Sequence, residues 1–276
     1  MNRIDQIFKL RRASGSAAMI FYVTVGYPDI ETTETVIDEL ARAGTDIVEI
    51  GMPFSDPMAD GPTIQQASAV ALEGGVTTRQ ILEMIARVRK RHPRLGLLIF
   101  SAYNPIFHFG QTDFVRRAAR AGADGLMIPD LPPEQAGELR LACARHRFST
   151  VFFVAPTTTP ERIDRIAEAS TGFIYYFSLK GVTGARDALP EDLEQKVRAL
   201  KARTQTPVAV GFGISKPEQA RRIAGFADGV IVGSALIRII GDRQATEPLP
   251  HRVAAYARAM VAAAAGDPSV PCGRSS

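Results

Sequence analysis

The chain alternates two hydrophobic patterns along most of its length. Short runs rich in β-branched and other apolar residues predict buried strands, and longer segments with apolar residues every three or four positions predict amphipathic helices. Strands that alternate with helices are typical of a parallel sheet with helical crossovers. The predicted strands are residues 19–25, 47–51, 96–101, 125–128, 150–154, 173–177, 208–211 and 229–232.

A weak internal repeat marks three places where a predicted helix gives way to a strand or apolar run. The sequences AGTD, AGAD and GFAD occupy residues 43–46, 121–124 and 225–228. In the first two, Gly44 and Gly122 can adopt the left-handed conformation that ends a helix. The helix before Gly44 is expected to begin after Pro28 and Asp29, because aspartate is a favoured helix start.

Eight strand and helix units in 276 residues favour a single α/β domain, a (β/α)8 TIM barrel. Residues 1–12 and 251–265 predict extra N-terminal and C-terminal helices outside those units. The alternative, an open doubly wound sheet, normally has fewer strands and a glycine-rich first turn, which residues 25–28 do not supply. We expect residues 1–265 to form the barrel and residues 266–276 to form a disordered tail, since the tail lacks periodicity.

Composition narrows the classes of partner. The net charge of +4 arises from 33 basic and 29 acidic residues mixed along the chain, which argues against nucleic-acid binding. Two cysteines are too few for a disulfide framework or a zinc site. No segment approaches the ~20 apolar residues of a membrane span, and residues 1–12 lack a signal-peptide core. We expect a cytoplasmic protein without nucleic-acid or membrane partners.

Glycines follow the last two predicted strands, where TIM barrels commonly bind phosphate. Gly213 follows the seventh strand, and Gly233 and Ser234 follow the eighth at the start of a helical pattern. Backbone N–H groups near glycine and the positive end of a helix dipole both favour an anion. The glycines could instead serve only to make tight turns. The pattern favours a phosphorylated small molecule without identifying it.

Acidic residues mark the end of the second strand and the loop after it. Alternation places Glu49 on the same face as Ile47 and Gly51, toward the barrel mouth. A carboxyl group among apolar neighbours has a raised pKa, which suits proton transfer near neutrality, although a structural ion pair is an equally open interpretation. Asp56 and Asp60 follow in the loop, either as turn formers or as a second carboxylate with a different role.

Lys180 follows the sixth predicted strand and could form a Schiff base with a carbonyl substrate. Its glycine-rich surroundings favour instead a mobile loop, with Gly181 and Gly184 as hinges of a lid.

The run VEIGMPFSDPMADGPTIQ, residues 48–65, closely resembles the signature of the tryptophan synthase alpha subunit family. The similarity continues through YNPI at 103–106, PDLP at 129–132, YY at 175–176, GVTG at 181–184 and the two glycine loops. It covers nearly the whole chain except the tail. The resemblance implies the cleavage of indole-3-glycerol phosphate into indole and glyceraldehyde 3-phosphate, with no metal or organic cofactor in this chain.

The resemblance also assigns roles to individual residues. It implies that Glu49 and Asp60 are the catalytic carboxylates and that Thr183 closes against Asp60 when the lid shuts. The residues implied to hold the phosphate are Gly184, Gly213, Gly233 and Ser234. The residues at the positions that line the family's indole slot are Tyr22, Ile64, Phe100, Tyr175 and Phe212. Ordinary core packing would account equally well for Tyr22, Phe100 and Phe212.

Family members pair with a beta subunit that uses pyridoxal phosphate to join indole with serine, which implies an alpha2beta2 complex. The residues implied to meet this partner are Pro53, Asp56, Pro57, Asn104 and Pro132, although loop rigidity would also explain the prolines. The resemblance is weaker at Phe177, Leu179 and Lys180, where many relatives carry other residues. These differences bear on lid closure and partner coupling. Other possibilities are a stand-alone lyase, a non-catalytic activating subunit and a Schiff-base aldolase or phosphosugar isomerase. Intact Glu49, Asp60 and both glycine loops argue against the non-catalytic reading.

Overall fold

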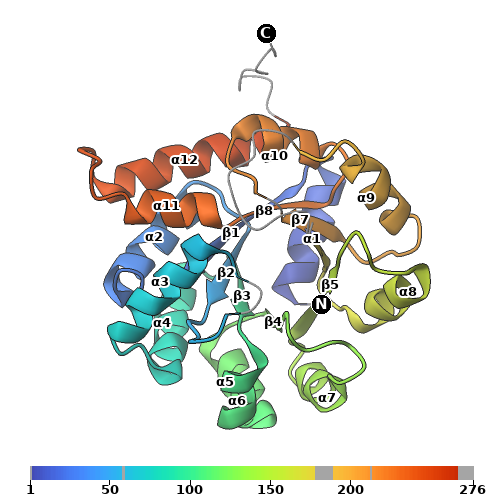
Figure 1. The fold of residues 1–276 in the computed structure, drawn as a ribbon, viewed down its shortest axis with the longest axis horizontal. Coiled ribbons are helices and arrows are strands. Elements are labelled where there is room, and N and C mark those ends of the chain that lie inside the picture. Colours follow the sequence, from blue (N-terminus) through green and yellow to red (C-terminus); the bar gives the residue numbers. More distant parts are fainter. Residues whose placement is uncertain (1, 58–59, 178–188, 212, 267–276) are drawn as a thin grey trace.

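Eight parallel strands form a closed barrel in chain order (Figure 1). The computed structural model describes residues 2–57, 60–177, 189–211 and 213–266, so the expected tail lies outside the described residues from residue 267 onward. Each strand begins and ends within one residue of its prediction, and barrel closure excludes the open sheet. The strands are β1 (Ala18–Thr24), β2 (Ile47–Gly51), β3 (Gly96–Phe100), β4 (Gly125–Met127), β5 (Ser149–Val154), β6 (Ile174–Phe177), β7 (Val208–Gly211) and β8 (Gly229–Val232).

Helices surround the barrel and cover its outer face (Figure 1). The helices of the described residues are α1 (Arg3–Ala13), α2 (Ile30–Arg42), α3 (Pro62–Glu73), α4 (Thr78–Arg91), α5 (Tyr103–Phe109), α6 (Gln111–Ala121), α7 (Gly137–Arg145), α8 (Pro160–Ala169), α9 (Leu193–Lys201), α10 (Pro217–Ala224), α11 (Ser234–Gly241) and α12 (Leu249–Ala264). The expected helices at both ends of the chain are α1 and α12. Helix α12 packs against α10 and α2 and so joins the last part of the ring to the first.

Local signals set the ends of the helices as predicted. The Asp29 side chain accepts a hydrogen bond of 2.6 Å from the Thr32 amide and caps the start of α2. Gly44 follows α2 with a φ of +92°, and Gly122 ends α6 with a φ of +99°. Residues with a side chain rarely adopt these left-handed backbone conformations, so glycine allows the chain to turn directly into the next strand.

The hydrophobic core consists of two layers separated by the barrel wall. The larger layer lies between the strands and the outer helices, and the smaller layer fills the barrel interior. Ile4, Ile7 and Phe8 of α1 belong to the interior layer. Ile4 and Ile7 lie against Gly96, the first residue of β3, so α1 closes the amino-terminal end of the barrel.

The aspartates of the internal repeat tie neighbouring strands together at this closed end. Each one lies just before a strand and accepts a hydrogen bond from the backbone of the adjacent strand. Asp46 accepts from the Met19 amide at 2.8 Å. Asp124 accepts from the Leu97 amide at 2.9 Å, and Asp228 accepts from the Val208 amide at 2.9 Å.

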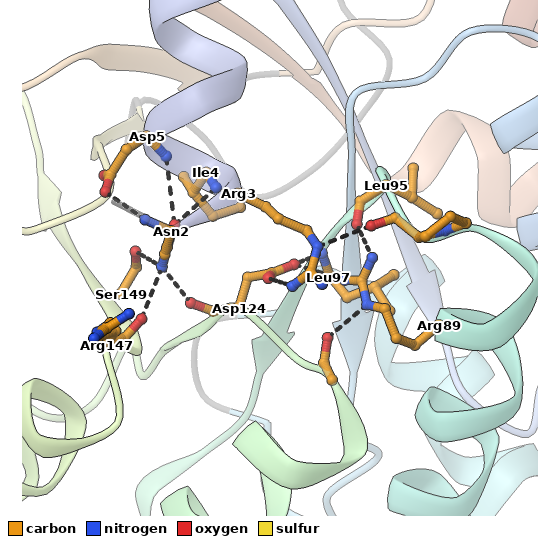
Figure 2. A network of polar contacts seen from close by, with 12 residues as sticks. Asn2, Arg3, Ile4, Asp5, Arg89, Leu95, Leu97, Asp124, Arg147 and Ser149 are labelled. Atoms are coloured by element: carbon orange, nitrogen blue, oxygen red, sulfur yellow. Dashed lines mark hydrogen bonds and ion pairs between the residues drawn. The ribbon is translucent and has the colours of Figure 1, made fainter.

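Arginines of α1 bind all three repeat aspartates. Arg11 donates to Asp46 at 2.9 Å, Arg3 donates to Asp124 at 2.8 Å, and Arg12 lies 3.8 Å from Asp228. Figure 2 shows Asp124 reached by Arg3 and by Arg89, which comes from α4. The repeat therefore holds the strand starts and α1 together at the amino-terminal end of the barrel.

Candidate active site

Glu49 lies inside the barrel, at the end opposite α1. In the strand register it stands beside Tyr22 of β1 and Leu98 of β3, and it is 1% exposed. Its Oε1 atom has no hydrogen-bond partner among the described residues. Burial raises the pKa of Glu49 to about 8. These features disfavour the structural ion pair, because an ion pair would favour the charged carboxylate.

Asp60 precedes α3 and shares the electrostatic environment of Glu49. It is half-buried, and burial raises its pKa to about 6. Its carbonyl accepts a 2.9 Å hydrogen bond from the Gln65 side chain, which fixes the backbone at this point. The negative charges of Asp60 and Glu49 both add to the effect of burial in raising the pKa values of Tyr22 and Tyr175. The two acids and two phenols therefore interact electrostatically at one place.

Aromatic rings form a continuous wall beside these acids. The Tyr22 and Phe100 ring centroids are 5.5 Å apart, and Phe100 and Phe153 are 6.4 Å apart. Phe153 lies 5.1 Å from Tyr175, and Phe177 contacts both of these rings. Edge-to-face and tilted pairs of this kind leave ring faces and edges for a flat aromatic ligand.

Phe153 belongs to this wall although no sequence motif indicates it. Alternation along β5 was the available signal, because Val151 lies in the interior layer of the core and Phe153 stands two residues further on. Phe177 belongs to it as well, through its ring contact with Phe153.

Glycines at the ends of two strands give the phenol groups their room. A Cβ atom at Gly51 would lie 2.3 Å from the Tyr22 hydroxyl oxygen, and one at Gly211 would lie 2.1 Å from that of Tyr175. Both distances are far shorter than real Cβ contacts allow. The strand ends of β2 and β7 are therefore shaped around the tyrosines.

The expected phosphate-binding residues that the structure describes, Gly213, Gly233 and Ser234, follow β7 and β8 at the same end of the barrel. Helix α11 begins at Ser234 directly after β8, with Gly233 as its N-cap and no acidic residue in its first turn. A Cβ atom at Gly233 would lie 3.6 Å from Tyr22 and 3.8 Å from Ile64, so the helix start adjoins the aromatic wall. Gly213 is exposed, has a φ of +50° and faces open space. Free amides at a helix start suit an anion.

The remaining expected site residues divide into those that the structure describes and those that it does not. Thr183, Gly184, Phe212 and the alternative nucleophile Lys180 lie outside the described residues. Asp56 and Asn104 are exposed, whereas the three prolines expected at the partner surface are half-buried. These five expected partner-surface residues lie in the segments that follow β2, β3 and β4. The Tyr103 amide, after β3, donates a hydrogen bond of 2.9 Å to the Asp130 carboxylate, after β4.

The described parts of the chain contain neither a metal-binding cluster nor a membrane-spanning helix. No group of three or more His, Cys, Asp and Glu residues there could hold a metal ion. Within the same residues, no helix has the length and apolar character needed to cross a membrane.

Comparison with known proteins identifies the family. The family model described as tryptophan synthase alpha chain matches residues 8–265. The tryptophan synthase alpha chain of Geotalea daltonii is 46% identical over 86% of this chain and 90% of its own length, and that of Aquifex aeolicus is 45% identical over 88% and 94%. A chain of Mycobacterium tuberculosis tryptophan synthase superposes with a TM-score of 0.87 at 39% identity, covering 95% of this chain and 98% of the other. The alpha subunit of Legionella pneumophila tryptophan synthase gives 0.89 at 36% identity, covering 97% and 99%. The chain described here belongs to the tryptophan synthase alpha chain family.

Proposed function

We propose that Glu49 and Asp60 carry out the family's reaction in this chain, the cleavage of indole-3-glycerol phosphate into indole and glyceraldehyde 3-phosphate. The observation that carries this proposal is the pair of acids at the barrel mouth, with pKa values raised to about 8 and about 6. At neutral pH the first is mainly protonated and the second mainly ionised. One acid and one carboxylate within the same site are what proton-dependent bond cleavage requires.

The chemistry follows from the protonation states. Breaking the bond between the indole ring and the glycerol phosphate chain would leave an electron pair on ring carbon three, so that carbon is protonated first, by Glu49. The cation that results is stabilised by ionised Asp60 near the ring nitrogen. The side-chain hydroxyl then loses its proton to Glu49, the carbon–carbon bond breaks and the aldehyde forms. Glu49 is thereby returned to its starting state.

The surrounding residues bind the two halves of the substrate. Tyr22, Ile64, Phe100 and Tyr175 supply the slot for the indole ring, and Phe153 extends it. The backbone amides at Gly213, Gly233 and Ser234 hold the phosphate at the start of α11. By resemblance, the indole slot also includes Phe212 and the phosphate site also includes Gly184. Thr183 is proposed, also by resemblance, to close against Asp60.

The chain works with a beta subunit that takes up the indole. Family membership supports this pairing and also indicates a cytoplasmic enzyme without a cofactor of its own, pyridoxal phosphate being bound by the beta subunit. Pro53, Asp56, Pro57, Asn104 and Pro132 form the proposed contact surface. The exposure of Asp56 and Asn104 supports this assignment.

The proposal is tested by measuring indole release from indole-3-glycerol phosphate with and without a beta subunit. We expect strong activation by the beta subunit, and full activity of the isolated chain would instead identify a stand-alone lyase. Asp60→Asn should lower kcat strongly, because a neutral amide does not stabilise the cation. The matched control is Asp56→Asn, an exposed acid of the same loop, which should keep the kcat of the isolated chain. An effect of Asp60→Asn on KM alone would contradict charge stabilisation, and borohydride trapping at Lys180 would favour a Schiff-base aldolase.

A further inference from the structure

Helix α12 contacts the segment after β7 through a half-buried tyrosine. The hydroxyl of Tyr256 donates a hydrogen bond of 3.1 Å to the carbonyl of Ser215. Ser215 lies two residues beyond Gly213, so this bond anchors the segment that carries the proposed phosphate-binding amide. Burial raises the pKa of Tyr256 above its ordinary value, so the group keeps its proton and remains a donor.

Gln219 holds the same residue from its other side. Its side-chain oxygen accepts hydrogen bonds from the amides of Ser215 at 2.8 Å and of Lys216 at 3.1 Å. Gln219 lies on α10 and is buried, which makes it a fixed partner. The amide and the carbonyl of Ser215 are therefore held by two different helices.

Tyr256 is itself held in place by packing. Its ring lies edge-on to Phe21 of β1, with 6.1 Å between centroids, and Phe21 is fully buried. The ring thus rests on the barrel wall while the hydroxyl reaches the segment after β7. Removing the hydroxyl alone would leave the ring contact with Phe21 intact.

Arg252, one helical turn before Tyr256, holds the far end of α11. Its guanidinium donates to the carbonyls of Ile239 at 2.8 Å and of Asp242 at 3.3 Å. These carbonyls lie at the carboxyl end of α11, where a cation offsets the negative end of the helix dipole. The opposite end of α11 is the one that begins at Ser234.

The space between these two contacts is not filled by side chains. A solvent-open hollow of about 410 Å³ is lined by Ser215, Ala235, Arg252 and Tyr256, among others. Across this hollow, the hydrogen bonds from Tyr256 and Arg252 link the segment after β7 and α11 to the same helix, α12.

We propose that Tyr256 and Arg252 are positioning residues that hold residues 213–215 and α11 in the relative placement needed to bind the substrate's phosphate. Neither residue is proposed to touch the substrate. The inference rests on the phosphate site proposed above and extends it to the helix behind it.

The test is the variant Tyr256→Phe, assayed in the complex with a beta subunit. Loss of one hydrogen bond should raise KM for indole-3-glycerol phosphate about two- to tenfold and leave kcat within about twofold. Inhibition by glycerol 3-phosphate should weaken by the same factor, whereas inhibition by indole should not change. A merely structural role would not separate the phosphate ligand from indole. The matched control is Tyr176→Phe, which removes a hydroxyl from a buried tyrosine of the outer core layer and should leave all four values unchanged.

A second variant separates failure of this inference from failure of the phosphate site. Ser234→Asp places a negative charge at the start of α11 and should weaken glycerol 3-phosphate binding more than Tyr256→Phe does. If Ser234→Asp has no effect on that ligand, the phosphate site itself is wrong. If Ser234→Asp weakens binding while Tyr256→Phe and Arg252→Met leave it unchanged, the positioning role is wrong. Equal weakening of glycerol 3-phosphate and indole by Tyr256→Phe would also overturn it.

Discussion

The two ends of the barrel place carboxyl groups in opposite environments. At the amino-terminal end, Asp46, Asp124 and Asp228 each bind a backbone amide and at least one arginine. At the carboxyl end, Oε1 of Glu49 has no hydrogen-bond partner within the part of the chain that the structure describes. The first end is built for stability and the second leaves an acid available for proton transfer, which is the usual division of roles in this fold.

Asp46 and Glu49 show the physical basis of this difference. Burial raises the pKa of both, but for Asp46 the hydrogen bonds from Arg11 and from the Met19 amide oppose it. For Glu49 burial acts without opposition and raises the pKa to about 8. Asp46 and Glu49 are three positions apart in the sequence, and their placement just before β2 and within it decides which form is stabilised.

The largest expected effect comes from Glu49→Gln. Removing the proton donor should lower indole release by about 10²- to 10⁴-fold, the usual contribution of a placed general acid. The variant should remain folded, and urea unfolding should show it gaining stability relative to the native chain as pH rises. Folding raises the pKa of Glu49 from 4.5 to about 8, so the unfolded chain releases this proton first and the native chain loses stability between about pH 4.5 and about pH 8, whereas glutamine does not ionise. Normal turnover by the folded variant would remove Glu49 from the mechanism.

Asp124→Asn should act on stability and leave chemistry alone. The Asp124 side chain is 2% exposed and pairs with Arg89, which is 12% exposed, and with Arg3, which is 40% exposed, so the substitution removes the charge from one buried pair and one partly exposed pair. Breaking a buried pair costs about 3–5 kcal/mol of unfolding free energy, measurable by urea denaturation. At permissive temperature kcat per folded molecule should match the native chain. A variant of native stability with reduced kcat would contradict the division between the two ends.

The pH profile tests the two acids of the mouth together. Glu49 must carry its proton and Asp60 must be ionised, so kcat/KM should be greatest between about pH 6 and about pH 8. Outside this window kcat/KM should fall about tenfold per pH unit. Because the two acids interact, the apparent pKa values of the acidic and alkaline limbs describe the pair of acids together. Asp60→Asn should remove the acidic limb while retaining the alkaline one. A flat profile from pH 5 to 9 would show that neither acid controls the reaction.

The smallest effect is expected from an ion pair on the surface. Arg162 and Glu134 lie 3.0 Å apart with both side chains more than a third exposed. Solvent screens such pairs, so Arg162→Gln should change the unfolding free energy by less than about 1 kcal/mol in urea denaturation. A loss as large as that of Asp124→Asn would show that burial is not what gives the amino-terminal contacts their strength.

Local sequence patterns determined the strands, the caps and the direction of the Glu49 side chain. The eight apolar runs predicted every strand to within one residue, because a strand buried on both faces requires such a run. Gly44 and Asp29 marked helix ends through backbone preferences that act over a few residues. The alternation around Glu49 indicated its inward face. For Asp60, in a loop without periodicity, position left a turn former and a second carboxylate equally open, and the family motif favoured the second.

Tertiary structure decided which groups meet after the barrel closes. Asp124 and Arg3 are 121 residues apart and Tyr256 and Ser215 are 41 apart, and no periodic pattern links such positions. Phe153 joins the aromatic wall because barrel closure places it beside Tyr175 of β6 and near Phe100 of β3. The repeat aspartates and Glu49 are all acids beside or within apolar runs. Barrel closure brings arginines of α1 to the repeat aspartates, while Glu49 at the other end faces aromatic rings and keeps its raised pKa.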